Sequence, residues 1–413
     1  MLKNLLFILV LTCVFHNLVA QRIISFPNIS EHQNNIIITS KKTDSIAQLD
    51  IADILNKIFK RNNRYDSISN YKTSLSIVPG IDYIPSSGFR INATASVSSF
   101  ASEDPDQKLT TSSLIASYSQ KKQAAVTLFS NIWTTNNNYT FQGSWWYLHF
   151  PEQTYGLGST TNQNKQNEVI YSYVRFYESI LKKIYLNIYA GIGYKLDYHY
   201  DIKEKGTKDG SISDLDKYGN TTTSVSSGLS FDFLFDSRKN SINPGKSAYL
   251  SIVYTPKQKI LKSDNTWQSL QLDVRKYITL AGNSKRILAF WSLLSFTNGY
   301  APYLDLPSTG WDLQLKSSGR GYAQGRYRGK NMLYFESEYR FLITRNGLFG
   351  AVVFANAQSF SEMTNRNFKT ILPAAGGGIR IKLSKQSKTN LCFDYGFGIH
   401  RSKGLFVNIG EIF

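Results

Sequence analysis

The sequence predicts an all-β protein, a sixteen-stranded antiparallel transmembrane β-barrel whose sixth extracellular loop is tucked into the lumen. Three observations predict this fold. The chain begins with a stretch typical of an export signal, many segments alternate apolar and polar residues with a period of two, and Tyr, Phe and Trp make up 14% of the residues. A barrel in lipid has apolar residues at alternate positions and aromatic residues at both interfaces.

Residues 1–20 have the features of a signal peptide. Lys3 supplies the basic start, Leu5–Phe15 is an almost entirely apolar run, and Ala20 completes an acceptable cleavage site. The apolar run is too short to span a bilayer as a helix, which needs about 20 residues. After cleavage Cys392 is the only cysteine, so no internal disulfide can form.

The composition excludes some classes of protein and leaves others open. No other stretch approaches about 18 consecutive apolar residues, which argues against a helical membrane protein. By length alone the mature chain could instead form two or three soluble domains. The net charge of +18 could indicate nucleic acid, but an exported protein rarely meets any. Lumen-facing Lys and Arg, or loops on anionic lipid head groups, explain the charge better.

The period-two pattern predicts which face of each strand meets lipid. In Leu333–Ile343, for example, most of the apolar residues share one face, while Glu336, Glu338 and Arg340 share the other. A slip by one residue would put every charge into lipid, so the register is strongly fixed. Such segments fall at roughly 73–79, 89–100, 109–120, 123–133, 138–150, 168–180, 184–199, 221–235, 246–256, 266–279, 285–298, 331–343, 348–358, 374–383, 389–399 and 404–413.

The connections between these segments give an independent test of the count. From a periplasmic N-terminus, every odd connection is extracellular and can be long, and every even one is short. The third, fourth, sixth and seventh odd connections are long and polar (151–167, 200–220, 299–330 and 359–373). Most even connections are tight (Thr134–Asn137, Leu181–Lys183, Ala281–Ser284, Thr344–Gly347 and Lys385–Ser387). The short stretch Gln120–Lys122 on the supposed outer side is an exception.

Residues 21–72 precede the barrel, which we place at 73–413, and they form a periplasmic N-terminal segment. Apolar residues at helical spacing predict a short amphipathic helix within Asp50–Lys60. The helix could pack on the barrel mouth as part of a solvated linker, or serve as a lumen plug or partner-docking element.

The sixth odd connection carries the most informative motif, Gly319-Arg320-Gly321-Tyr322 followed by Gly325-Arg326-Tyr327-Arg328-Gly329. Glycine permits close approach of the backbone to another chain segment. The motif therefore predicts a loop that folds back into the lumen and is tethered there by Arg320.

The stretch Ser317–Phe341 resembles the Arg-Gly-Tyr/Phe loop of the bacterial surface antigen superfamily, whose barrels include BamA, TamA and two-partner secretion transporters. Asp236-Ser237-Arg238 resembles that family's Asp-x-Arg turn, and Gly376–Phe413 resembles its last three strands. The resemblance covers about residues 70–413. It implies a sixteen-stranded barrel with the motif in the sixth extracellular loop, and it implies that Phe413 is the terminal signal read by the barrel-assembly machinery.

Two departures from the family pattern matter. Residues 21–72 are too short for even one POTRA domain, so the chain resembles a POTRA-less branch. The family's loop arginine meets an aspartate on the following strands, whereas this chain has Asn356 at that place. An Arg–Asn hydrogen bond lacks the charge assistance of a carboxylate. Glu336, Glu338 or Asp394, all on the inferred lumen face, could supply the counter-charge instead.

The sequence gives only weak indications of catalysis or metal binding. Glu336 and Glu338 could form an acid–base pair, but pairing with lumen arginines explains them better, since nothing beside them resembles a nucleophile. Asp197, His199 and Asp201 could bind a metal, but they have no second His or Cys cluster and fit a girdle near the loops better. We therefore predict no enzyme, no cofactor and no bound metal.

We expect a barrel of the bacterial outer membrane that contributes to outer-membrane protein assembly, insertion or translocation. The expected partners are outer-membrane lipid and lipopolysaccharide, with other outer-membrane or periplasmic assembly subunits as further candidates. The segments at 73–79 and 404–413 would form a seam that opens sideways, because the first is short and ends at Pro79-Gly80. The alternative is a passive or gated pore for small solutes with an anion-favouring lumen.

Overall fold

The computed structural model describes residues 48–58, 73–84, 88–219, 221–280, 286–310, 318–362 and 367–413. All of them belong to one compact unit formed by residues 46–413. The expected signal peptide (1–20) and most of the expected N-terminal segment (21–72) lie outside the described residues.

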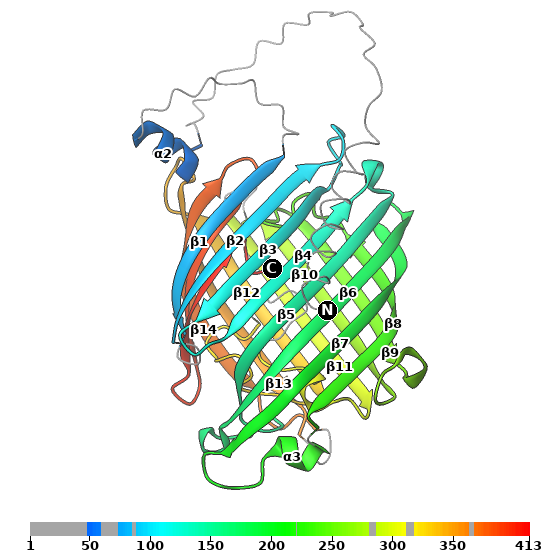
Figure 1. Ribbon diagram of the computed structural model, residues 1–413. Helices are drawn as coiled ribbons and strands as arrows, with labels where there is room; N and C mark the ends of the chain where they lie inside the picture. The colour runs from blue at the N-terminus through cyan, green and yellow to red at the C-terminus, as the bar shows by residue number, and fades with distance from the viewer. Residues whose placement is uncertain are drawn as a thin grey trace, which may run out of the picture. The chain divides into compact units, whose positions relative to one another are not determined.

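The described residues form a sixteen-stranded antiparallel sheet in which neighbours in sequence are neighbours in space (Figure 1). The predicted fold class is confirmed. The strands are β1 Ser74–Ile84, β2 Gly88–Phe100, β3 Leu109–Ser119, β4 Ala124–Trp133, β5 Tyr139–Thr154, β6 Asn167–Tyr185, β7 Ile188–Thr207, β8 Thr223–Asp236, β9 Ser247–Lys257, β10 Trp267–Thr279, β11 Arg286–Gly299, β12 Asn331–Leu342, β13 Phe349–Phe360, β14 Leu372–Ser384, β15 Thr389–Gly398 and β16 Lys403–Ile409.

Side chains alternate between an apolar outer face and a polar inner face, as the period-two pattern predicted. On β12, Phe335 is exposed on the outer face, whereas its neighbours Glu336 and Glu338 are buried inside. On β15, Phe393 and Tyr395 are exposed on either side of the buried Asp394. The inside of the barrel is therefore where the charged residues gather.

The two ends of the barrel differ. One, called here the short-turn end, carries the connections that follow even-numbered strands. The other, the long-loop end, carries loop 3 (155–166), loop 4 (208–222, with helix α3 Asp214–Gly219) and loop 6 (300–330). The short 3₁₀ helices are η1 Thr135–Asn137, η2 Gln163–Lys165, η3 Lys259–Leu261 and η5 Tyr303–Asp305.

One predicted turn is wrong. The stretch Leu181–Lys183 lies inside β6, and the chain reverses at Leu186-Asn187 instead. The strands β5, β6 and β7 also extend further towards the long-loop end than predicted, because they continue to pair with one another out to Thr154, Asn167 and Thr207. The predicted turn Ala281–Ser284 lies outside the described residues.

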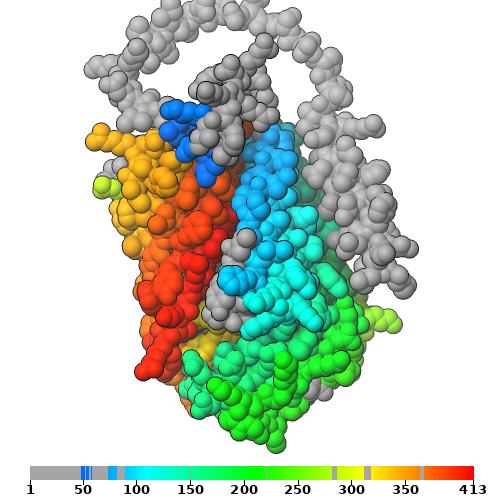
Figure 2. Space-filling view, turned by 60° about the vertical axis from the view of Figure 1, so that its left-hand side comes forward, coloured from blue at the N-terminus to red at the C-terminus, as the bar shows by residue number. Residues whose placement is uncertain are grey.

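The first strand is longer than predicted. We expected it to end at Pro79-Gly80, but β1 continues to Ile84, and Pro79 and Gly80 pair with Ala93 and Asn92 of β2. An edge strand tolerates proline because one of its sides has no ladder to disrupt. In the described residues β1 pairs with β2 alone and β16 pairs with β15 alone. The two strands nevertheless lie side by side (Figure 2).

The last strand is shorter than predicted. We expected it to reach Phe413, but β16 ends at Ile409. Gly410 has a φ of 84°, a left-handed conformation that turns the chain out of the strand. Residues 411–413 are buried, with Phe413 fully enclosed. The terminal residues therefore form a tail inside the barrel instead of the end of a lipid-facing strand.

The helix α2 (Ile51–Ile58) lies within the stretch expected to be helical. The backbone N–H of Asp50 donates to the side chain of Asp53, and the N–H of Asp53 donates to the side chain of Asp50, which caps the first turn. Lys385, in the β14–β15 turn, donates to the Asp53 carboxylate at 2.8 Å. These contacts attach the helix to the short-turn end. No helix among the described residues is long and apolar enough to cross a membrane.

Candidate functional site in the barrel interior

Loop 6 runs back into the barrel and carries a fully buried arginine. Arg320 is 0% exposed and donates from Nη1 to Asp394 Oδ2 at 2.7 Å. Its Nη2 donates to both Glu336 and Glu338. The three carboxylates named as candidate lumen partners therefore all contact this guanidinium. Charge-assisted bonds of this kind are the strong ones in proteins, and a buried charge needs them.

Two further arginines connect this cluster to the end of the chain. Arg340 donates from Nε to Glu338 Oε2 at 2.7 Å. Arg380 donates to Asp394 Oδ1 at 2.5 Å and to Glu411 Oε2 at 2.8 Å. The name Arg320 cluster is used below for the charged residues Arg320, Glu336, Glu338, Arg340, Arg380, Asp394 and Glu411. Each of its four carboxylates contacts at least one of its three arginines.

Glycines let the loop backbone lie directly on the barrel wall. Gly321 has a φ of 106°, and a Cβ there would lie 2.9 Å from the Cβ of Ala374. A Cβ on Gly396 of β15 would lie 2.7 Å from the backbone nitrogen of Gly321. These distances leave no room for side chains, so the two glycines set how deeply Arg320 enters the lumen.

A phenyl ring completes the arginine site. The Arg320 guanidinium lies 3.7 Å from the centroid of the Phe354 ring, which is within cation–π range. A Cβ on Gly376 would lie 2.5 Å from that ring, so the glycine makes space for it. The triplet Gly376-Gly377-Gly378 thus serves close packing in this part of the wall.

Asn356 does not take the role that the resemblance assigns to an aspartate at this place. Its Nδ2 donates to the backbone carbonyl of Arg320 at 2.9 Å and not to the guanidinium. Tyr322 is also held, because its hydroxyl donates to the Pro373 carbonyl at 2.6 Å and accepts from the N–H of Ile399 at 3.2 Å. These contacts fix the position of the loop, while the three carboxylates pair with the charged Arg320 guanidinium.

The second half of the motif contacts a different part of the barrel. Arg326 donates to the carbonyl and the hydroxyl of Thr161 in loop 3, at 2.8 and 3.1 Å. A Cβ on Gly325 would lie 2.7 Å from the carbonyl oxygen of Gln153, so this glycine allows close packing against β5.

Arg328 is a buried anchor that the sequence reasoning missed. It is 1% exposed, donates to Glu152 Oε1 at 2.9 Å, and donates to the carbonyls of Tyr303, Leu304 and Leu306. Tyr171 donates to the other oxygen of Glu152 at 2.8 Å. The Gly-Arg-Tyr-Arg-Gly stretch already marked Arg328 as a candidate anchor. Residue spacing could not identify Glu152 as its partner, because the two residues are distant in sequence.

The residues considered for a metal take other roles. Asp197 and His199 are buried, whereas Asp201 is exposed in a bulged part of β7 with a φ of 55°. Asp197 contacts Arg175 at 3.2 Å and Lys257 at 3.1 Å. His199 Nδ1 lies 3.6 Å from Asp305 of loop 6, whose other oxygen accepts from Ser226 at 2.5 Å. Burial, followed by the nearby Asp197 carboxylate, raises the pKa of Asp305 to about 7.

The terminal Phe413 packs among aromatic residues inside the barrel. Its ring lies 5.3 Å from that of Trp291 and 6.3 Å from that of Tyr277. Arg340 donates from Nη2 to the Phe413 backbone oxygen at 2.9 Å. The tail is thus bonded to the same arginine that contacts Glu338, and it belongs to the site.

A cavity of about 780 Å³ remains in the interior. Polar side chains of β1–β5 form much of its lining, loop 6 contributes Ser318, Tyr322 and Gln324, and the cavity reaches both β1 and β16. Its lining contains many Ser, Thr and Asn residues together with charged residues, among them Lys195, Asp232 and Arg275.

Comparison with known proteins supports the fold. No protein-family model matches this chain, and no curated protein matches its sequence. Among solved structures it resembles BamA from Haemophilus ducreyi lacking POTRA domains 1–3, with 15% identity and a TM-score of 0.51 over 87% of this chain and 78% of that one.

Two structures of CdiB are also similar. The one from Acinetobacter baumannii shows 11% identity and a TM-score of 0.50, and the one from Escherichia coli shows 8% and 0.51. Each match covers 82% of this chain but only 65% and 62% of the CdiB chains, less than two thirds of their length. The chain therefore has the barrel fold found in BamA and CdiB, and BamA is one of the barrels that the sequence resembled.

Proposed function

We propose that this chain is a barrel of the bacterial outer membrane that contributes to the assembly, insertion or translocation of other proteins. The fold similarity to BamA and CdiB supports this class of function. The proposal includes no catalytic step and no cofactor.

The observation that carries the proposal is the seam between β1 and β16. Both strands have one paired side and lie next to each other without a ladder between them. An unpaired strand edge is a template on which another chain can add a strand. A barrel that only conducts solutes gains nothing from such an edge, since closure is what removes it.

Loop 6 supports a controlled opening. The Arg320 cluster holds one limb of the loop on β12 and β15, and Arg328 holds the other on β5 through Glu152. The loop thus ties two separated parts of the wall together from the inside. We infer that it occupies part of the lumen and limits how far β1 and β16 can separate.

The partners follow from this role. Lipid and lipopolysaccharide would surround the apolar outer face, and assembly subunits of the outer membrane or periplasm would supply surfaces for clients. Co-purification of native complexes tests this part of the proposal.

A crosslink across the seam tests the opening directly. In a Cys392→Ala background, one cysteine is placed at Ser76 or Val78 of β1 and one at Phe406 or Asn408 of β16. The readout is the rate at which the chain, reconstituted in liposomes, promotes folding of a simple outer-membrane barrel protein. We expect oxidation to abolish the promotion and a reductant to restore it.

The matched control is a crosslink between strands that are already paired. Ser96 of β2 and Ser113 of β3 face each other with their hydroxyls 2.9 Å apart. Cysteines at these positions should leave the promotion unchanged after oxidation. Equal activity of the seam-locked and control-locked barrels would rule out opening at the seam.

The alternative of a small-solute pore has one feature in its favour, the interior cavity of about 780 Å³. Planar-bilayer recordings distinguish the two. A plugged barrel should give low conductance that rises in Arg320→Ala, whereas large and steady conductance that is unaffected by this substitution would favour the pore.

A further inference from the structure

The connection between β8 and β9, residues 237–246, lies at the short-turn end and is called the strap below. It begins with the Asp236-Ser237-Arg238 turn that resembles a family motif. Arg238 donates from Nε and Nη2 to the two Asp236 carboxylate oxygens, at 2.9 Å each, and its guanidinium lies 3.9 Å from the centroid of the Tyr249 ring. Arg238 is buried and lines the interior cavity, so the strap starts on the lumen side of the wall.

One side of the strap is attached to the connection that follows β2. The Leu109 N–H donates to the Lys239 carbonyl at 3.1 Å. Lys239 donates from Nζ to the Pro105 carbonyl at 3.1 Å, and the same Nζ lies 2.8 Å from Asp106 Oδ1. Because β2 pairs with β1, this first attachment holds the β1 flank of the seam.

A buried lysine strengthens the first attachment. Lys108 is 4% exposed and donates from Nζ to the carbonyls of Asp236 and Arg238. Its ammonium lies 5.2 Å from the centroid of the Trp133 ring, within cation–π range. Hydrogen bonds from a charged donor are about twice as strong as neutral ones. The first attachment is therefore the stronger kind of contact.

The other side of the strap is attached to the β16 flank of the seam by neutral hydrogen bonds. Asn240 donates from Nδ2 to the Ser387 carbonyl, in the β14–β15 turn, at 2.8 Å. The Ile242 carbonyl accepts from the N–H of Glu411, in the tail that follows β16, at 3.0 Å. Glu411 also pairs with Arg380. This second attachment therefore meets the Arg320 cluster.

Asn240 also gives the strap its shape. Its Oδ1 accepts from the N–H groups of Ile242 and Asn243, at 2.8 and 3.1 Å, which is the pattern of an Asx turn. Asn243 in turn donates from Nδ2 to the Lys388 carbonyl at 3.3 Å. One side chain thus sets the bend of the strap and holds it on the β14–β15 turn.

The strap closes part of the interior cavity at the short-turn end. Its residues Ser241 and Ile242 line the cavity of about 780 Å³ together with Ser387, Gly410 and Glu411. The strands β8 and β9 lie in the middle of the strand order, far from β1 and β16. The strap therefore reaches from the opposite part of the wall to both flanks of the seam.

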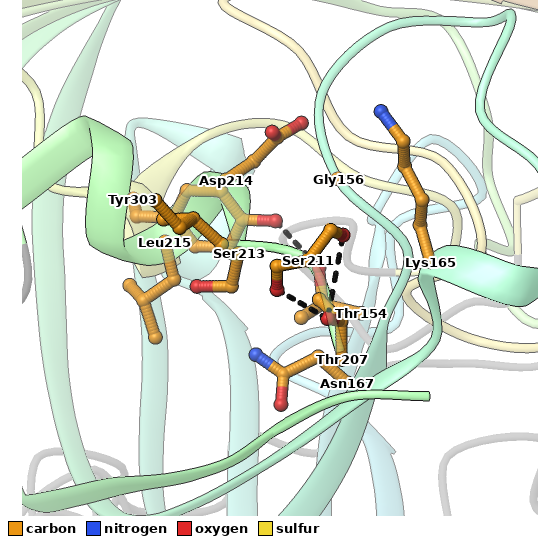
Figure 3. Close-up of a pocket in the computed structure, with 11 residues that line it drawn as sticks. Thr154, Gly156, Lys165, Asn167, Thr207, Ser211, Ser213, Asp214, Leu215 and Tyr303 are labelled. Carbon is orange, nitrogen blue, oxygen red and sulfur yellow. Dashed lines mark hydrogen bonds between the residues drawn. The ribbon is translucent and has the colours of Figure 1, made fainter. Parts of the chain in front are cut away.

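The loops at the long-loop end make a different set of contacts. Figure 3 shows a small cavity of about 10 Å³ lined by Thr154, Asn167, Asp214 and Tyr303 among others, which come from β5, β6, α3 and η5. The hydroxyls of Thr154 and Tyr303 lie 2.6 Å apart, and Asp214 accepts from the Leu157 N–H at 2.8 Å. These contacts hold loops 3, 4 and 6 together on the β5–β7 side of the barrel, whereas the strap contacts both flanks of the seam.

We propose that the strap is a latch for the seam. It holds the β1 and β16 flanks together at the short-turn end, and it releases from Ser387 and Glu411 when the two strands separate. The second attachment releases first because its hydrogen bonds are neutral, and water replaces such bonds at little net cost. The strap then stays on the β2–β3 connection. The link between this release and client proteins rests on the proposed function, but the holding of the seam does not.

Distances across the seam test the latch without any client. Spin labels are attached after Leu75→Cys and Val407→Cys, at two exposed residues of β1 and β16, in a Cys392→Ala background. Pulsed EPR then measures the distance between the labels in the whole chain, reconstituted in liposomes. In Asn240→Ala the population at longer distances should rise about five- to ten-fold, as the loss of a hydrogen bond produces.

Lys246→Ala is the matched control for this measurement. Lys246 is an exposed residue of the same strap, and within the described part of the chain it takes part in no hydrogen bond or ion pair. Its distances should equal those of the wild type. Unchanged distances in a folded Asn240→Ala barrel would overturn the latch. If Asn240→Ala does not fold, the crosslinks described next decide the question.

A reversible crosslink tests which attachment releases. Asn243→Cys with Lys388→Cys, joined by a short thiol crosslinker that a reductant cleaves, fastens the second attachment. Lys239→Cys with Asp106→Cys fastens the first attachment in the same way and is the matched control. In the liposome folding assay, the crosslink on the second attachment should remove most of the promotion, and the reductant should restore it. The crosslink on the first attachment should leave the promotion unchanged.

The outcomes separate the latch from the proposed function. Equal losses with both strap crosslinks would overturn release at the second attachment. No loss with either of them, in a barrel that the seam crosslink does inactivate, would overturn the latch and leave the proposed function standing. Longer seam distances in Asn240→Ala, with full promotion in every crosslinked barrel, would support the latch and overturn the proposed function.

Discussion

Gly321 of loop 6 lies directly on Gly396 of β15, with backbone against backbone. A Cβ on Gly396 would lie 2.7 Å from the Gly321 nitrogen and 3.0 Å from the carbonyl carbon of Arg320. The loop can reach this depth because neither residue has a side chain. The contact between these two glycines therefore decides where the Arg320 guanidinium lies.

Gly396→Ala should displace loop 6. The added methyl group meets backbone atoms that cannot rotate away, and overpacking of this kind costs about 1–3 kcal/mol. We expect faster protease cleavage in 318–330 and lower stability to urea in liposomes. The matched control is Gly404→Ala on the register partner in β16, where the new Cβ meets only the far end of the Phe406 ring. If both variants resist protease as the wild type does, the contact does not position the loop.

Arg320→Ala should destabilise the barrel strongly. It leaves Glu336, Glu338 and Asp394 buried with fewer counter-charges, and removing one partner of a buried ion pair costs about 3–5 kcal/mol. Arg326→Ala is the control, because its hydrogen bonds to Thr161 involve no carboxylate and should cost about 0.5–3 kcal/mol. Urea unfolding followed by tryptophan fluorescence compares the two. Equal losses would mean that the charge pairing is not what holds the loop.

Asp305 should make the loop 6 anchor sensitive to pH. Its pKa of about 7 lies above the ordinary value of 3.8, so the folded protein binds this proton more tightly than the unfolded chain does. The free energy of unfolding should therefore fall as the pH rises from about 4 to about 7 and stay low above that range. The groups that face Asp305 are Ser226, His199, Asp197, Lys257 and Arg175.

Asp305→Asn removes the titrating group and should flatten this part of the pH profile. Hydrogen exchange of 299–310, measured at several pH values, follows the loop locally. A wild-type profile that rises between pH 4 and 7, or a slope that survives in Asp305→Asn, would contradict the prediction.

Phe413→Ala should open a cavity beside Trp291 and Tyr277. Truncation of a buried phenylalanine costs about 3–5 kcal/mol. Phe413→Tyr separates packing from the expected role in assembly, because it keeps a terminal aromatic residue but adds a hydroxyl to a closed aromatic pocket. We expect Phe413→Tyr to reach the outer membrane normally and to unfold in less urea than the wild type. A failure to assemble with unchanged stability would point to the signal role instead.

The sequence by itself determined the strands, their faces and the place of the long loop. These follow from local rules, since a period of two assigns each residue to lipid or lumen without knowledge of any distant partner. Alternation on β12 and β15 was enough to place Glu336, Glu338 and Asp394 inside. The Gly-Arg-Gly-Tyr stretch was enough to single out loop 6 as the segment that enters the lumen.

Only the tertiary structure decided which groups meet inside the barrel. Glu152 meets Arg328, Glu411 meets Arg380, and Asn356 binds a carbonyl in place of a guanidinium. These contacts form because loop 6 and the terminal tail fold into the barrel and meet strands that are distant from them in sequence. The inward turn at Gly410 could not be predicted from the sequence either. An apolar terminal residue suits a lipid-facing strand and a dry interior pocket alike, and the choice depends on whether Trp291, Tyr277 and Arg340 surround such a pocket.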